Sequence, residues 1–454
     1  MDLIVALLLL FVSARLAGEA MERIGQSPMI GEVLAGVVLG PTILGLIDPD
    51  PLMEPGASLA IVASLGVLVL VLLAGIELGR EGLARAFRER SIVVAYVEFL
   101  LPFTLGYALG SALGWGFDRS LFLGTALAVT ALPVSVRILL DLNLLHSRLG
   151  RAIVSVALVN DLIAFAMLAL VLELARLGGS IPDASTFALI VGKNLVFFSI
   201  VLCAARALRF AARPDESGES RMRLLLQKLR GQESAFAMSL AIALALGAAA
   251  EGVGIHFAIG VFYGGILITP RLLGREQFAQ IRKSVSSVTF GLLAPIFFAF
   301  VGLNFTLTFA SWWLILPVTG VAFAGKFFGG VLGGYVAGFR GAPLAALGVG
   351  LNARGMMELL LAQVGLAAGI INADIYAALV AMTLITTLST PPLMKRLLRR
   401  FKVQDVIPQG ASSAARSVQG PDEALTSKPP SIRGGVVQVK TERDEEDEVV
   451  LADP

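Results

Sequence analysis

The sequence predicts an all-α polytopic membrane protein with about 13 transmembrane helices and inverted repeats. Of its 454 residues, 56% are hydrophobic and only 15% are charged, and the mean hydropathy is +0.82. A soluble domain has about a quarter of its residues charged, so this chain needs lipid as its solvent. The apolar runs do not alternate with polar residues, as the strands of a membrane β-barrel would. Soluble, fibrous and disordered classes are therefore excluded for most of the chain.

The predicted spans are apolar runs that approach the roughly 20 residues a membrane helix requires. They cover 3–16, 29–47, 59–78, 92–115, 121–141, 152–172, 187–208, 235–250, 255–268, 288–303, 311–337, 343–366 and 375–394. Every loop on one side contains Lys or Arg, with the largest number in 209–234, whereas the opposite loops contain only Arg119 and Arg176. Because basic loops stay in the cytoplasm, we expect a cytoplasmic C-terminus, an outside N-terminus and a location in the inner (plasma) membrane.

Residues 1–402 are predicted to form the transmembrane domain, and 403–454 a disordered cytoplasmic tail. The tail is rich in Ser, Gly, Pro and charge, a composition that does not bury enough apolar area to fold alone. The net charge of +2 does not favour nucleic acid as a partner. The single cysteine excludes an internal disulfide, and two histidines do not favour a multi-His metal centre. No cofactor is expected.

An internal repeat relates residues 3–172 to 235–394, with 187–208 as the linking span. Gly31, Gly36 and Pro41 recur 229 positions later, the motif at Gly75 recurs after 227, and Glu98 with Gly106 matches Lys326 with Gly334 after 228. Corresponding spans are seven apart, an odd number, so the two copies would be inverted in the membrane. Inverted repeats are typical of carriers that open alternately to either side.

Asp161, near the middle of span 152–172, is the leading candidate for an ion-binding residue. A charge at this depth is costly, so it indicates a function or a partner. A carboxyl group in a low dielectric takes up a proton readily, and its oxygens are also hard ligands for a small cation. Asn160 beside it offers a carbonyl oxygen. The alternative is a structural carboxylate paired with Lys or Arg.

Four other charged residues within the spans allow more than one interpretation. Lys326 is either a counter-charge that competes with the cation or a structural cation, and Glu98 is a candidate membrane-edge or structural group. Arg354 and Glu358 are spaced i, i+4 and so share a helix face. We interpret them as an internal salt bridge rather than as direct transport residues.

Two spans are predicted to be interrupted. Pro133 removes a backbone donor in span 121–141, and residues 348–355 of span 343–366, which include Gly348, Gly350 and Gly355, form a weak helix. The two spans are repeat partners, and paired interrupted helices are a strong pointer to an ion site.

Several motifs together resemble the monovalent cation/proton antiporters of the Kef and plant cation/proton exchanger branch. The resemblance covers about residues 20–395, in order, and is carried by 25–36, 130–134, 160–161, 295–298, Gly302, 325–326 and 352–358. It implies the sodium/proton antiporter fold, with two crossed discontinuous helices in a core domain, a separate dimerisation domain and a homodimer. It also maps the ion-binding Asp onto Asp161, the residue before it onto Asn160, a core lysine onto Lys326 and a polar crossing-helix position onto Thr130. We therefore expect Asp161, Asn160 and Thr130 to bind the cation or the proton, with a monovalent cation at Asp161.

The expected function is exchange of Na+ or K+ for H+ across the lipid bilayer by an elevator-like movement. A second Asp beside Asp161 is absent, which favours an electroneutral cycle. The alternative is a cation channel or uniporter on the same fold. A membrane enzyme is disfavoured because no ordered Ser/His/Asp set or metal cluster is found.

Overall fold

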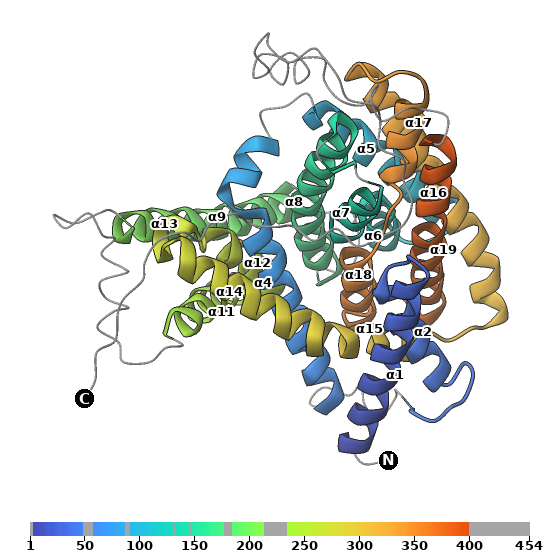
Figure 1. Ribbon diagram of the computed structural model, residues 1–454, viewed down its shortest axis with the longest axis horizontal. Coiled ribbons are helices and arrows are strands. Elements are labelled where there is room, and N and C mark those ends of the chain that lie inside the picture. The colour runs from blue at the N-terminus through green and yellow to red at the C-terminus, as the bar shows by residue number, and fades with distance from the viewer. Residues whose placement is uncertain are drawn as a thin grey trace, which may run out of the picture. The chain divides into compact units, whose positions relative to one another are not determined.

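The computed structural model describes residues 3–48, 58–86, 91–130, 132–142, 144–145, 147–176, 184–212 and 234–398. The regular elements of this part are all helical (Figure 1). They are α1 (Leu3–Arg23), α2 (Pro28–Leu39), α4 (Ser58–Ala86), α5 (Ser91–Ala112), α6 (Phe117–Ala128), α7 (Leu132–Asp141), α8 (Arg148–Arg176), α9 (Ala184–Ala211), α11 (Ser234–Val253), α12 (Phe257–Leu267), α13 (Pro270–Leu273), α14 (Arg275–Val288), the π-helix η1 (Thr289–Leu293), α15 (Ala294–Leu303), α16 (Phe309–Val336), α17 (Gly341–Gly350), α18 (Met356–Ala367) and α19 (Ala373–Leu398).

Each predicted span corresponds to one of these helices or to a pair of them, which confirms the all-α membrane class. Within the described residues, nine helices are long and apolar enough to cross a bilayer, and α2, α12, α17 and α18 are shorter apolar helices. The count of thirteen crossings stays a prediction, and the predicted tail at 403–454 lies outside the described residues.

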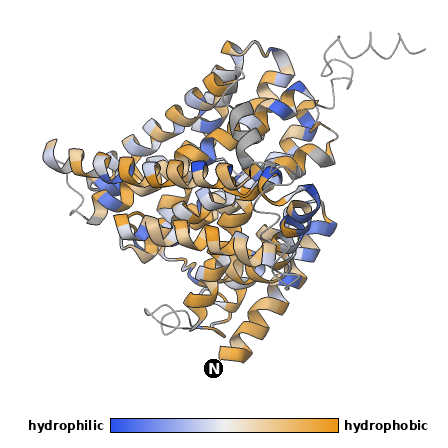
Figure 2. Cartoon of the chain, turned by 90° about the vertical axis from the view of Figure 1, so that its left-hand side faces the viewer, coloured by the Kyte–Doolittle hydropathy of each residue, from blue (hydrophilic) through white to orange (hydrophobic). Residues whose placement is uncertain are grey.

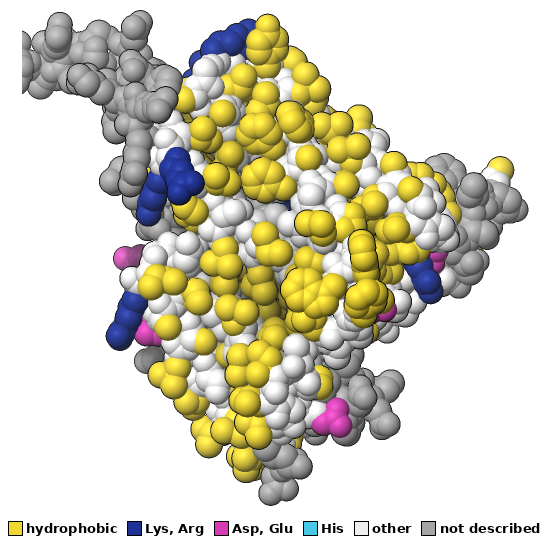
Figure 3. Space-filling view, turned by 90° about the vertical axis from the view of Figure 1, so that its right-hand side faces the viewer, with side chains coloured by type: hydrophobic (Ala, Val, Ile, Leu, Met, Phe, Trp, Pro, Cys, Tyr) yellow, Lys and Arg dark blue, Asp and Glu magenta, His cyan; other side chains and the backbone are white. Residues whose placement is uncertain are grey.

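The outer surface has the composition expected for contact with lipid. Hydrophobic residues cover most of the helices' length (Figure 2), and one broad face is almost free of charge, with Lys, Arg, Asp and Glu at its margins (Figure 3). Large exposed apolar side chains include Phe309, Trp313, Leu316 and Leu332 of α16. In water such a surface would drive aggregation, whereas in a bilayer it is the favourable one.

The helices contact one another in two groups. In one group α5, α6, α8, α16, α17, α18 and α19 pack together, with α7 against α8; in the other α1, α2, α4, α11, α12 and α15 pack together (Figure 1). Helix α4 contacts α8 and so joins the groups. Both interrupted helices belong to the first group.

Close glycine contacts recur in the second group and follow the internal repeat. A Cβ at Gly36 of α2 would lie 1.9 Å from the carbonyl oxygen of Ala299 in α15. One at Gly265 of α12 would lie 2.6 Å from that of Leu72 in α4. Gly36 and Gly265 are 229 positions apart, and Leu72 and Ala299 are 227 apart. These are the offsets found for the repeat in the sequence. The two copies therefore use the same backbone-to-backbone packing.

The predicted register of the third repeat pair is wrong. A Cβ at Gly124 would lie 2.6 Å from the Phe103 carbonyl oxygen, and one at Gly348 would lie 2.6 Å from that of Phe327. Gly124 and Gly348 are 224 positions apart, and so are Phe103 and Phe327, whereas the predicted offset is 228. Glu98 and Lys326 are thus about one helical turn out of equivalence, because glycines are frequent enough in these spans to match in more than one register.

Candidate functional site

The centre of the first helix group is formed by two breaks in the helices. Helix α6 ends at Ala128, Val129 is extended (φ −73°, ψ 150°), and α7 begins at Leu132. Between α17 and α18 the chain is non-helical and buried, and Gly355 is extended (φ 175°). The breaks lie against each other, since the Thr130 hydroxyl is 3.3 Å from the Leu351 carbonyl oxygen. The prediction of two crossed, discontinuous helices is confirmed.

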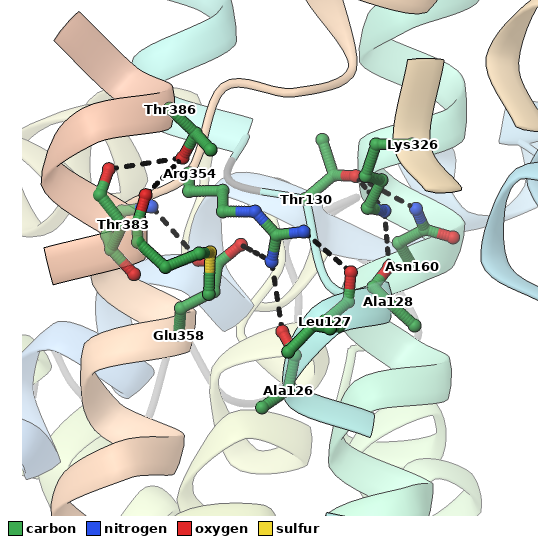
Figure 4. A network of polar contacts seen from close by, with 12 residues as sticks. Ala126, Leu127, Ala128, Thr130, Asn160, Lys326, Arg354, Glu358, Thr383 and Thr386 are labelled. Carbon is green, nitrogen blue, oxygen red and sulfur yellow. Dashed lines mark hydrogen bonds and ion pairs between the residues drawn. The ribbon is translucent and has the colours of Figure 1, made fainter. Parts of the chain in front are cut away.

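A buried polar cluster lies beside the first break and includes four of the predicted site residues: Lys326, Thr130 and Asn160, which Figure 4 shows, and Glu98. Lys326 Nζ donates to Glu98 Oε1 at 2.5 Å, to Thr130 Oγ1 at 2.6 Å and to the Ala128 carbonyl oxygen. Asn160 Nδ2 donates to Glu98 Oε2 at 2.5 Å and to Thr130 Oγ1 at 3.1 Å. An ammonium group has three N–H donors, so the donors of Lys326 are all used. Of the two interpretations of Lys326, the geometry matches the structural cation.

Glu98 is fully buried, with no exposure of its side chain. The side chain therefore lies inside the protein rather than on its surface. Its two oxygens accept hydrogen bonds from three parts of the chain: Lys326 of α16, Asn160 of α8 and Thr130 at the break. The carboxylate joins these segments and neutralises the lysine.

Arg354 and Glu358 are at the second break. The guanidinium of Arg354 is 3.7 Å from Glu358 Oε1, the ion pair expected from their spacing. Its shorter contacts are to the end of α6: NH1 donates to the Ala126 carbonyl oxygen at 3.0 Å and NH2 to that of Leu127 at 2.6 Å (Figure 4). The last carbonyls of a helix have no partner within it, and their partial negative charge attracts a cation. The Arg354 side chain thus caps the C-terminal end of α6.

Asp161 differs from these residues because its carboxylate has no ion-pair partner in the described part of the chain. The residue is 6% exposed, and its Oδ1 has no hydrogen-bond partner there. The amide oxygen of Asn160 is also buried and has no partner among the residues that the structure describes. Adjacent residues of α8 therefore supply two buried acceptor oxygens without donors.

Thr387 of α19 is a residue that the sequence reasoning missed. Its hydroxyl accepts from the backbone N–H of Arg354 at 3.2 Å and donates to the Arg354 carbonyl oxygen at 2.8 Å. A signal was present, because buried threonines recur at helical spacing along this span: Thr383, Thr386, Thr387 and Thr390. A threonine in an apolar helix usually bonds to its own helix, so the pattern did not single out Thr387.

The sequence model of the family described as "Sodium/hydrogen exchanger, transmembrane" matches residues 6–399. The chain belongs to this family. The protein is thus a multi-pass membrane protein of a transporter family, and the relatives it matches are described as Na(+)/H(+) or cation/H(+) antiporters, which supports cation/proton exchange.

Curated relatives of this exchanger include bacterial and plant antiporters. The Na(+)/H(+)-K(+) antiporter GerN of Bacillus cereus is 31% identical over 390 residues, which cover 85% of this chain and 94% of GerN. The Na(+)/H(+) antiporter of Enterococcus hirae is 27% identical over 397 residues, covering 87% and 98%. Cation/H(+) antiporter 19 of Arabidopsis thaliana is 29% identical over 437 residues, covering 92% of this chain and 52% of the plant protein.

The fold of this exchanger is also found in a solved structure, that of the sodium proton antiporter MjNhaP1 from Methanocaldococcus jannaschii. The match has a TM-score of 0.66 at 15% identity and covers 87% of this chain and 96% of the other. At that identity the likeness establishes the fold, and the roles of individual residues have to come from their own contacts.

Proposed function

We propose that this protein exchanges Na+ or K+ for H+, one for one, with Asp161 as the residue that holds either the proton or the cation. The relatives support both cations, since GerN is described as a Na(+)/H(+)-K(+) antiporter and the Enterococcus hirae relative as a Na(+)/H(+) antiporter. The proposal extends that shared activity to a residue and a stoichiometry.

The observation that carries the proposal is the pairing pattern of the buried acids near the two breaks. Glu98 is paired with Lys326 and Glu358 with Arg354. Asp161 is buried without such a basic partner in the described residues. A buried carboxylate without a partner is unstable as a bare ion. It therefore holds a proton or a cation, and the mutual exclusion of the two couples their transport.

Oxygen ligands for a dehydrated cation are available next to Asp161. Asn160 uses both N–H groups of its amide on Glu98 and Thr130, so its carbonyl oxygen is left to accept. Sodium and potassium ions are bound through oxygen, as other hard cations are. We assign the Asp161 carboxylate and the Asn160 carbonyl oxygen to this role, and Thr130 to holding Asn160 in place.

A count of the groups that change charge supports an electroneutral cycle. Asn160 occupies the position where a second carboxylate would double the charge. Lys326 has acceptors for all three N–H groups of an ammonium ion, including the carboxylate of Glu98, and it keeps this form throughout the proposed cycle. Only Asp161 then exchanges its proton, and one monovalent cation replaces it.

The inverted repeats support alternating access, because two copies of one structure exchange conformations when the site turns from one side of the membrane to the other. We further propose a homodimer in the inner membrane, with the N-terminus outside and the C-terminal tail in the cytoplasm. The distribution of Lys and Arg among the loops supports this orientation.

Proteoliposomes that contain the purified protein and an internal pH dye test the proposal. With an acidic interior, external Na+ or K+ should raise the internal pH, and choline should not. Cation uptake that leaves the internal pH unchanged when no potential is allowed to form would show a channel or uniporter and reject antiport. A series of single cations in the same vesicles gives the selectivity.

A further inference from the structure

The break between α17 and α18 places backbone polar groups in the interior of a membrane protein. Leu351, Asn352, Ala353 and Arg354 are fully buried. Away from water, a backbone N–H or C=O without a hydrogen-bond partner strongly destabilises the folded protein. Each of these groups therefore needs a hydrogen bond from within the protein. For Arg354, both backbone groups are bonded to one side-chain oxygen, that of Thr387.

This arrangement is specific to Thr387 among the buried threonines of α19. The hydroxyls of Thr383, Thr386 and Thr390 donate to carbonyl oxygens of their own helix, those of Leu379, Met382 and Thr386, at 2.8–2.9 Å. Thr387 instead donates out of its helix, across to the carbonyl oxygen of Arg354. The Thr387 hydroxyl thus holds the break through both backbone groups of Arg354, its N–H and its C=O.

The side chain that begins at this fixed backbone reaches the other break. Arg354 donates to the carbonyl oxygens of Ala126 and Leu127, and Lys326 donates to that of Ala128. The three carbonyls are the last of α6, directly before Val129 and Thr130. Thr130 in turn accepts from the Asn160 amide. Hydrogen bonds, together with the short stretch of chain from Ala126 to Thr130, therefore connect Thr387 through Arg354 to Asn160, the residue beside Asp161.

We propose that Thr387 is a positioning residue for cation binding, which acts by holding Arg354 and with it the end of α6 at the ion site. The inference rests on the proposed exchange at Asp161. Without the hydroxyl, the Arg354 backbone loses both of its bonds and its guanidinium is no longer aligned with the two carbonyls. Asn160 and Asp161 would then lie in a less ordered site, with weaker cation binding.

The test compares Thr387→Val with Thr383→Val in proteoliposomes. Both substitutions remove a buried hydroxyl from the same helix without changing its shape, but only the first removes a bond to Arg354. Since a lost buried hydrogen bond is comparable to about a tenfold change in an equilibrium constant, Thr387→Val should raise the apparent KM for the cation by about that factor. Thr383→Val should keep the KM of the wild type, and Thr387→Ser should restore it.

Equal KM values for the two valine variants would overturn the inference, as would a KM of the Thr387→Val variant that matches the wild type. If Thr387→Val does not fold, Thr387→Cys replaces it, because a thiol is a weak hydrogen-bond partner of similar size. The cysteine variant should then show a raised KM that the serine variant does not. Wild-type vesicles measured alongside keep the two proposals apart, because a wild type without exchange would overturn the proposed function itself.

Discussion

The carboxylate of Glu98 and the ammonium group of Lys326 lie 2.5 Å apart between α5 and α16, and neither side chain is exposed. The residues are 228 positions apart in the chain, and the contact joins the two halves of the repeat. A buried pair of this kind is poor evidence of added stability, because the cost of desolvation offsets much of the attraction. It does determine what the Lys326 ammonium group bonds to, namely Glu98, Thr130 and the Ala128 carbonyl oxygen.

Removing one partner of this pair should lower the free energy of unfolding more than removing both partners does. Lys326→Met or Glu98→Gln alone leaves a buried group without its partner, which costs about 3–5 kcal/mol. The double variant should recover much of that loss. Thermal unfolding of the purified variants in detergent measures the coupling, and strictly additive losses would contradict the pair.

Transport by the Lys326→Met variant separates a structural lysine from an obligatory one. Because Lys326 already uses its donors on Glu98, Thr130 and Ala128, we expect slower exchange or a displaced pH optimum, but not complete loss. A folded Lys326→Met protein that is as inactive as Asp161→Asn would show that the lysine itself takes part in each cycle.

Asp161→Asn should abolish exchange and leave folding nearly unchanged. The substitution keeps the size of the side chain but removes its charge and its proton, and Oδ1 has no hydrogen bond in the described residues to lose. We expect a shift in unfolding free energy of within about 1 kcal/mol and cation-dependent pH changes at the level of empty vesicles. Asp118→Asn, at the start of α6, is the matched control and should transport normally. Retained coupling in the Asp161→Asn protein would remove Asp161 from the mechanism.

An imposed membrane potential should affect neither the rate nor the endpoint of exchange. One cation for one proton moves no net charge, and Asp161 is the single group assigned to that exchange. Sealed vesicles with a fixed cation gradient and a series of potentials provide the measurement. An endpoint that follows the potential would show that more than one proton moves per cation, and Lys326 would be the first group to examine.

Alanine at Gly36 should disrupt packing that alanine at Gly320 does not. The new Cβ at Gly36 would lie 1.9 Å from the Ala299 carbonyl oxygen, whereas at Gly320 it would have no neighbour within 4 Å. Overpacking of this kind typically costs about 1–3 kcal/mol, and an unhindered Gly→Ala change stabilises by about 0.4–1 kcal/mol. Melting temperatures of the two variants should therefore move in opposite directions. Gly265→Ala, the repeat counterpart, should behave like Gly36→Ala.

The hydropathy of the chain by itself determined the class of the protein and the position of its helices, and Pro133 and the glycines of 348–355 indicated the two interrupted spans. Lipid offers no partner to a backbone N–H or C=O, so an apolar run of sufficient length has to be helical. Gly350 and Gly355 also marked the second break correctly, because a glycine-rich segment is a weak helix. The repeat was visible where glycines contact a neighbouring backbone, as at Gly36 and Gly265.

The tertiary structure alone decided which polar groups meet. The spacing of Arg354 and Glu358 predicted a pair within one helix, but the shorter bonds of Arg354 are to carbonyls more than 220 positions away. Thr387 has its partner on another helix, and no local pattern distinguishes it from Thr383. A hydrogen bond depends on where atoms lie after the helices have packed. The sequence identifies the polar groups that need a hydrogen-bond partner within the membrane. The packing of the helices determines which partner each group has.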